Sequence, residues 1–421
     1  MTPTSGRAGT LAPRTLRRAR LLALVSVLGP GLLAGLSDDD PAGITTYSVL
    51  GAQYGYQMLW VLLLSTVALV VFHSLGARMG VVTGQGLIGL IRQRYGVRSA
   101  ALAVTVLVLA NVGTTCAEFA GIAAGFELFG VSRYVSVPIA AVVVSALVLR
   151  GSFHRVEHIL MGLATVLLAY IAAGLLGNPD WGEAFRGLVV PTMPLTRDAV
   201  LIATGTIGTT LAPWGLSFIQ SYAVDKKLTP ADLGYERVDV VTGAVLTGII
   251  GFFVVVACAS TLHVQGVTIS NAADAAGALE PLAGHLARSL FAVGLIGAAL
   301  LAAAVLPLST AYSVCEFTGF EAALDDEVSE ALLFYGTYVV VAGVAALIVL
   351  VPGIPLIPIL VLSQVLNAVL LLPLLTFMYG ISRDRDLMGD YTASRATAAL
   401  YLATIAFISV SVAALVVLGL G

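Results

Sequence analysis

The sequence has few charged residues and little polar surface for its length. Of its 421 residues, 11% are charged and 58% are hydrophobic, and the mean hydropathy is +0.98. A soluble globule needs more polar surface than this composition supplies. Apolar runs of about 18 or more residues, long enough for a helix to cross a bilayer, recur along the chain. The composition therefore predicts an integral membrane protein with the lipid bilayer as a partner.

Three further features that the sequence lacks exclude classes of function. A net charge of -3 offers no basic surface for nucleic acid. Only three cysteines are present, Cys116, Cys258 and Cys315, and they lie too far apart for a metal-ligand motif, so we expect buried thiols. No phosphate-binding loop, metalloprotease spacing or other soluble catalytic motif appears. We therefore expect neither an enzyme nor a bound cofactor.

The apolar runs predict eleven membrane-spanning helices in a single transmembrane domain, 1–421, after a basic segment, 1–20. The first helix is expected to break near 38–43 and the sixth near 209–215. The expected spans are about 21–50, 58–77, 100–128, 132–150, 155–177, 198–223, 238–262, 285–313, 330–351, 356–379 and 395–419.

The basic residues predict the orientation of these spans. With the N-terminus in the cytoplasm, only Arg133, Arg186, Arg197 and Arg288 of the 21 Lys and Arg residues fall outside. Cytoplasmic loops carry such an excess of Lys and Arg. We expect a multi-pass protein of the plasma (inner) membrane with an extracellular C-terminus. The oligomeric state stays open, with a monomer as one option.

Three consecutive aspartates, 38–40, lie inside the otherwise apolar first span, 21–50. Each carboxylate at mid-membrane depth costs about 2.5–3.5 kcal/mol to insert, so three imply a water-lined cavity, a bound cation or a counter-charge. Pro41 lacks a backbone N–H, and Gly43 favours non-helical backbone. The helix is therefore expected to unwind here and to expose carbonyl groups beside the carboxylates, as in transporter cation sites.

Pro213 interrupts the sixth apolar run in the way that Pro41 interrupts the first. Five spans separate the two breaks, and an odd number of spans reverses the direction of the chain. Spans 1–5 (21–177) and 6–10 (198–379) would then form an inverted repeat, with 395–419 as an additional helix. The alternative is that Pro213 makes an ordinary kink, because proline is common in membrane helices.

Several segments resemble one known family. Asp40–Gly43 (Asp-Pro-Ala-Gly) and Gln53–Tyr56 (Gln-Tyr-Gly-Tyr) resemble the first-helix signature of the Nramp family of divalent-metal transporters, Asp-Pro-Gly-Asn and Gln-Phe-Gly-Tyr. Residues 77–84, 117–118 and 372–377 resemble its second-span loop, third helix and tenth helix. The resemblance covers about residues 25–380. It implies an all-α, LeuT-like transporter fold with broken helices 1 and 6.

The resemblance also implies a metal site between the two broken helices. Asp40 aligns with the ligand carboxylate of the family, and we expect a ligand there rather than a helix cap. Asp39 would either support the ligand from behind or line an aqueous vestibule. Gly43 stands where the family has Asn. The carbonyl groups of Thr209 and Ala212 correspond to the unwound backbone of the family.

Three other polar residues are candidates near this site. Gln364 and Asn367 lie three apart on one face of the tenth span and would reach the ion through water. Interhelical hydrogen bonds explain the pair nearly as well. Glu118 is either a remnant of a proton path or a buried acid that is hydrogen-bonded to a neighbour.

Several residues differ from the family pattern, and these differences affect which ion the site would prefer. Ala212-Pro213-Trp214 stands where the family has Met-Pro-His, and Thr115 where proton-coupled members have Asp. This pattern resembles the Nramp-related magnesium transporters. A thioether selects softer metals, whereas carboxylate, carbonyl and water suit Mg²⁺ and Mn²⁺.

The sequence therefore predicts a secondary transporter that imports a divalent cation by alternating access. Mg²⁺ is the first choice and Mn²⁺ also fits, and no proton coupling is expected because two titratable groups of the family are missing. The alternative within the class is a proton-coupled Mn²⁺ or Fe²⁺ importer. From another class, the alternative is a non-transporting membrane receptor or scaffold.

Overall fold

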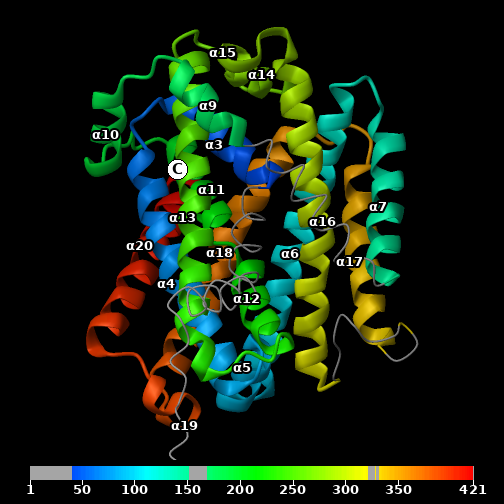
Figure 1. Ribbon diagram of the computed structural model, residues 1–421, viewed down its shortest axis with the longest axis vertical. Coiled ribbons are helices and arrows are strands. Elements are labelled where there is room, and N and C mark those ends of the chain that lie inside the picture. Colours follow the sequence, from blue (N-terminus) through cyan, green and yellow to red (C-terminus); the bar gives the residue numbers. More distant parts are fainter. Residues whose placement is uncertain (1–39, 151–167, 321–327, 329–330, 421) are drawn as a thin grey trace, which may run out of the picture.

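The structure is a computed structural model that describes residues 40–150, 168–320, 328 and 331–420 (Figure 1). In these ranges every regular element is a helix. Eight helical segments of the described chain are long and apolar enough to cross a membrane. The predicted all-helical membrane-protein class is confirmed, whereas the eight segments do not establish the predicted number of eleven.

Most predicted spans coincide with one long helix. Helices α18 and α20 begin at the predicted residue, and the other bounds differ from the predicted ones by a few residues, as expected where apolar composition alone sets the limits. The long helices are α4 (Leu59–Thr83), α6 (Val97–Glu127), α7 (Arg133–Leu149), α13 (Leu233–Cys258), α16 (Ala287–Thr318), α17 (Leu332–Val349), α18 (Leu356–Ser382) and α20 (Arg395–Leu420).

Helix α3 (Pro41–Tyr54) begins directly after Asp40. Proline suits the first helical position, because its missing N–H would have no partner there. The Asp40 carboxylate accepts a hydrogen bond from the N–H of Gly43 at 2.5 Å and so caps the helix. Gly43 therefore lies inside α3, and the predicted unwinding at Gly43 is wrong.

The predicted break in the sixth span is confirmed. Helices α11 (Arg197–Thr210) and α12 (Pro213–Asp225) are separated by Leu211 and Ala212. In a continuous helix the carbonyl of Thr209 would accept the N–H of residue 213. Proline has no N–H, so this carbonyl lacks its helical donor.

Some predicted features lie outside the described residues. These are the basic segment 1–20, the first span up to residue 39 with Asp38 and Asp39, and residues 151–167 of the fifth span. The described end of the fifth span contains α9 (Ala169–Leu176).

Short helices occupy most of the segments between the spans, where no helix was predicted, and two short turns, 259–263 and 284–286, overlap the ends of predicted spans. In Figure 1, α5 and α19 lie at one end of the bundle, and α14 and α15 lie at the other, with α10 nearer that second end. We call these the α5 end and the α14 end. The short helices are α5 (Leu87–Tyr95), α10 (Trp181–Val189), α14 (Ala272–Ala276), α15 (Glu280–Ala283), α19 (Arg385–Met388), the 3₁₀ turns Pro230–Asp232, Gly277–Leu279, Gly284–Leu286 and Gly389–Tyr391, and a π-helical turn, Ala259–His263.

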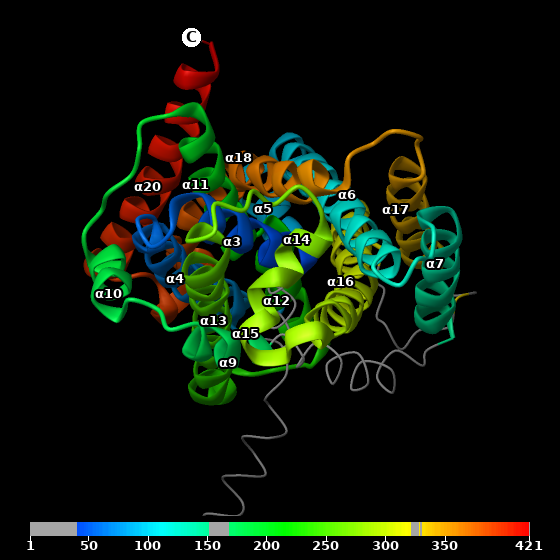
Figure 2. The same cartoon turned by 90° about the horizontal axis from the view of Figure 1, so that it is seen from above.

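Helix α3 lies in the interior of the bundle, where it contacts α6, α11, α13 and α18 (Figure 2). Two glycines permit the close approaches. A side chain at Gly121 of α6 would collide with Pro41, and one at Gly208 of α11 would collide with the backbone of Gln364 in α18. The start of α3 therefore packs against α6, and the end of α11 beside the α11–α12 break packs against α18, in the interior of the protein.

Candidate cation site

Asp40 stands at the start of α3 and is only 4% exposed. We predicted a ligand rather than a helix cap, but the cap is present, since Oδ1 accepts the Gly43 N–H. A carboxylate has two oxygen atoms and about four lone-pair positions. The cap therefore occupies part of this capacity and leaves room for a cation.

Glu118 of α6 is fully buried and lies close enough to Asp40 for the two carboxyl groups to interact. Neither oxygen of Glu118 has a hydrogen-bond partner among the described residues. The alternative of a buried acid that is hydrogen-bonded to a neighbour stays a prediction, with the adjacent Asp40 as that neighbour. Two adjacent acid groups inside a membrane protein need a proton or a cation to offset their charge.

The α11–α12 break supplies neutral oxygen atoms. Thr209 is 2% exposed, and its hydroxyl group has no hydrogen-bond partner in the described chain. Ala212 is the extended residue before α12, with φ -85° and ψ 145°. The Tyr47 hydroxyl of α3 is hydrogen-bonded to the Thr210 hydroxyl at 2.9 Å. The end of α11 at the break is therefore held against the middle of α3.

Gln364 and Asn367 form a hydrogen-bonded network. The Asn367 amide donates to Gln364 Oε1 at 2.9 Å and to Thr114 Oγ1 of α6 at 2.9 Å, and the Gln364 amide donates to Ser363 Oγ at 3.1 Å. The interhelical hydrogen bond that we kept as an alternative is thus present between α18 and α6. The water-mediated contact with an ion stays a prediction.

Sequence reasoning missed two polar groups of α3. The hydroxyl groups of Thr46 and Ser48 are buried and have no hydrogen-bond partner among the described residues. The run Thr-Thr-Tyr-Ser over residues 45–48 was the available signal, because such a polar run is unusual directly after a break in an apolar span.

The residues brought together define the chemistry of the site. In the described ranges, no three His, Cys, Asp or Glu side chains gather to hold a metal ion, and all three cysteines are buried free thiols, as predicted. A cation beside Asp40 would therefore rely on one or two carboxyl groups and on carbonyl, hydroxyl or water oxygens. Mg²⁺ and Mn²⁺ prefer this donor set.

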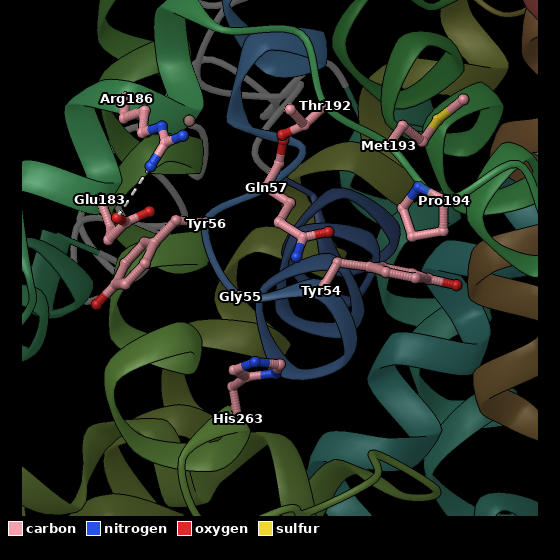
Figure 3. A pocket seen from close by; sticks show the side chains of 11 residues that line it. Tyr54, Gly55, Tyr56, Gln57, Glu183, Arg186, Thr192, Met193, Pro194 and His263 are labelled. Carbon is pink, nitrogen blue, oxygen red and sulfur yellow. Dashed lines mark hydrogen bonds and ion pairs between the residues drawn. The ribbon is translucent and has the colours of Figure 1, made fainter.

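A separate cavity of about 580 Å³ lies toward the α14 end, between the turn after α3 and α10. Figure 3 shows Tyr54, Gln57 and His263 around it, with the Glu183–Arg186 ion pair at its edge. With a rise of about 1.5 Å per residue, α3 places this cavity roughly 20 Å from Asp40. It is therefore distinct from the cation site.

Comparison with known proteins identifies the family of the chain. The family model described as "Natural resistance-associated macrophage protein-like", or Nramp, matches residues 31–418. The chain belongs to the Nramp family. Among its relatives, the divalent metal cation transporter MntH of Yersinia enterocolitica is 30% identical over 399 residues, which cover 91% of each chain. MntH of Granulibacter bethesdensis is 27% identical over 384 residues, covering 88% of this Nramp chain and 83% of the relative.

Solved structures share the fold of this Nramp protein. The Eremococcus coleocola manganese transporter has a TM-score of 0.75 at 18% identity, covering 96% of this chain and 87% of that one. Mhp1, a nucleobase-cation-symport-1 family transporter, has a TM-score of 0.57 at 15% identity, covering 93% and 91%. These likenesses confirm the predicted LeuT-like fold.

Proposed function

We propose that this Nramp protein imports a divalent metal cation by alternating access, with Mn²⁺ as its first substrate. The observation that carries the proposal is the buried Asp40–Glu118 pair at the start of α3, inside the bundle that also contains the α11–α12 break. The names of its relatives, divalent metal cation transporter and manganese transporter, support the ion. They favour the manganese alternative over the magnesium preference that the sequence placed first.

The same pair supports coupling to protons. Without a metal, the adjacent carboxyl groups of Asp40 and Glu118 can share a proton. A divalent cation bound there offsets their charge instead, and the proton leaves. Our expectation of uncoupled transport rested on Thr115 and Trp214, which do not titrate near neutral pH. The closeness of Glu118 to Asp40 supplies a titratable group at the ion itself.

Mg²⁺ is the second candidate because of Ala212. This residue is buried at the break and contributes no thioether. Mg²⁺ keeps several of its waters and binds through one or two carboxylates. A site with Asp40, backbone carbonyls and no soft ligand suits such a hydrated ion as well as it suits Mn²⁺.

The architecture around the site extends the proposal. We infer eleven spans, with 21–177 and 198–379 as an inverted repeat and with the α5 end in the cytoplasm. The exposed arginines Arg92, Arg94 and Arg98 at the α5 end support this orientation. The cavity at the α14 end would then be the outer vestibule. Asp39 stays a proposed support of the Asp40 ligand or part of an aqueous vestibule.

Flux into proteoliposomes tests the proposal. Uptake of Mn²⁺, Mg²⁺ and Ca²⁺ is measured together with internal pH, in wild type and in Glu118→Gln. We expect saturable Mn²⁺ uptake with proton entry in proportion, and loss of the proton signal in the variant. Faster uptake of Mg²⁺ than of Mn²⁺ would establish the second candidate. No flux of any of the three ions would contradict the transporter function.

A further inference from the structure

A cavity of about 490 Å³ lies near the α5 end, between α4, α13 and α20, away from Asp40. Its polar rim comes from the last turns of α4, the first turn of α13 and the first turn of α20, with Arg78, Glu236 and Thr397 in these positions. Three helix termini at one level place the rim where a membrane-spanning bundle meets lipid headgroups.

The rim carries charges that the protein leaves unpaired. Glu236 is 1% exposed, yet neither carboxylate oxygen has a hydrogen-bond partner among the described residues. Arg78 donates from Nη2 to the Tyr401 hydroxyl at 2.9 Å, but its buried Nε has no partner there. Arg237 makes no ion pair within the described ranges. One carboxylate and two guanidinium groups can therefore form further hydrogen bonds with a ligand.

Other charged groups surround Glu236 without satisfying it. Asp239 and Asp232 repel its carboxylate, and Lys226 attracts it, but none of the three forms a hydrogen bond with it. A buried carboxylate without donors is costly. A ligand that brings a positive hydrogen-bond donor would therefore be stabilised at this position.

The walls of the cavity are apolar and open toward the bilayer. Val70, Val71 and Val241 line it, together with Leu400 of α20, which is 44% exposed. Only 17% of the apolar window of α20 is buried inside the protein. Acyl chains can therefore reach the opening, whereas a soluble ligand would leave these walls uncovered.

We propose that this cavity binds a phospholipid whose headgroup carries both a phosphate and a primary ammonium, as in phosphatidylethanolamine. The guanidinium groups of Arg78 and Arg237 match the phosphate, because their planar forks donate paired hydrogen bonds to phosphate oxygens. The ammonium donates to Glu236. The lipid would add contacts between α4, α13 and α20 at their rims, beside the direct packing of α4 on α13 and the hydrogen bond from Arg78 to Tyr401.

Native mass spectrometry of the purified full-length protein tests this proposal. Phosphatidylethanolamine, phosphatidylglycerol and phosphatidylcholine are added to wild type, Glu236→Gln and Arg237→Gln, with Arg98→Gln as a matched control at an exposed arginine of the same end. We expect wild type to retain phosphatidylethanolamine most strongly. Glu236→Gln should lose about tenfold in that affinity, because a charge-assisted hydrogen bond is removed, and should bind phosphatidylglycerol unchanged. Arg237→Gln should bind both lipids more weakly.

Three results would overturn the proposal. One is that phosphatidylcholine, whose ammonium has no N–H, binds wild type as tightly as phosphatidylethanolamine does. A second is that Glu236→Gln keeps the wild-type preference while its thermal unfolding is unchanged. The third is that free phosphoethanolamine competes at the concentration of the lipid, which would make the ligand soluble. Since lipid retention is read without ion flux, the outcome is independent of the transport proposal.

Discussion

Asp40 has a structural role and a proposed chemical role that substitution can separate. Asparagine caps helices about as well as aspartate does but carries no charge. We expect Asp40→Asn to keep the cap on the Gly43 N–H and the wild-type thermal unfolding in detergent, while uptake of Mn²⁺ into proteoliposomes falls to background. Wild-type uptake in this variant would remove Asp40 from the ion path.

Asp40→Ala is the companion of that variant. Alanine loses both the charge and the cap, and loss of an N-cap typically costs about 1 kcal/mol. We therefore expect Asp40→Ala to unfold at a lower temperature than Asp40→Asn, with uptake abolished in both. If the two variants unfold alike, the hydrogen bond to Gly43 contributes little to stability.

Ala212 is the position at which a soft ligand can be introduced. We expect Ala212→Met to raise the affinity for Cd²⁺ relative to Mg²⁺ about tenfold, equivalent to about 1.4 kcal/mol, because a thioether favours the softer ion. Isothermal calorimetry measures both ions. Leu211→Met, which adds the same sulfur one residue away, is the control. Equal effects of the two substitutions would show that residue 212 does not face the ion.

At the residue scale, the sequence indicated which residues belong to the site better than it indicated which of them contact one another. The insertion cost of charge singled out Asp40 and Glu118, because each carboxyl lies in an apolar span. The closeness of these two residues was not predictable, because it depends on tight packing of α6 against α3. Gly121 permits this packing, since a side chain there would collide with Pro41. The helical state of Gly43 was missed for a similar reason: its N–H is satisfied by a cap, and this stabilisation outweighs the poor helix propensity of glycine.

Among the elements, α5, α12 and α16 are joined by one carboxylate. Glu316 of α16 accepts the Ile88 N–H at the start of α5 at 3.0 Å and the Ser221 hydroxyl of α12 at 2.6 Å. We expect Glu316→Ala to lower stability by about 1–2 kcal/mol, as for other lost caps, and to speed hydrogen exchange of the α5 amides. Ser221→Ala, which leaves the cap intact, should change α5 exchange much less. Equal α5 exchange in Glu316→Ala and wild type would contradict this role.

The positions of helices could be predicted from the sequence where an apolar run was long enough to cross a bilayer. Apolar runs of membrane-spanning length located α4, α6, α16 and α18, and a missing N–H located the α11–α12 break at Pro213. Helices such as α5 and α10 were missed because nine residues are too few to span a bilayer. Their helical state depends on caps and on packing against longer helices, which composition does not report.

For the whole molecule, the orientation in the membrane is a direct test. The native cysteines are buried, so they should react slowly with a membrane-impermeant maleimide. We expect Glu183→Cys, at the exposed surface of α10, to be labelled from outside intact cells. Asp390→Cys, exposed near the α5 end, should be labelled only after the membrane is permeabilised. The reverse pattern would invert the proposed topology, and labelling of both from outside would point to a different number of spans.

The Thr209 carbonyl has a consequence for how ion preference can change during evolution. Every amino acid has the same backbone carbonyl group, so no substitution at 209 removes it. The carbonyl lacks a helical N–H donor because the residue four positions later is proline. Natural selection can therefore act on specificity through side chains at neighbouring positions, Ala212 first among them, while the backbone oxygen is inherited unchanged. Descendants of one ancestral protein could in this way exchange one metal for another without rebuilding the helix break.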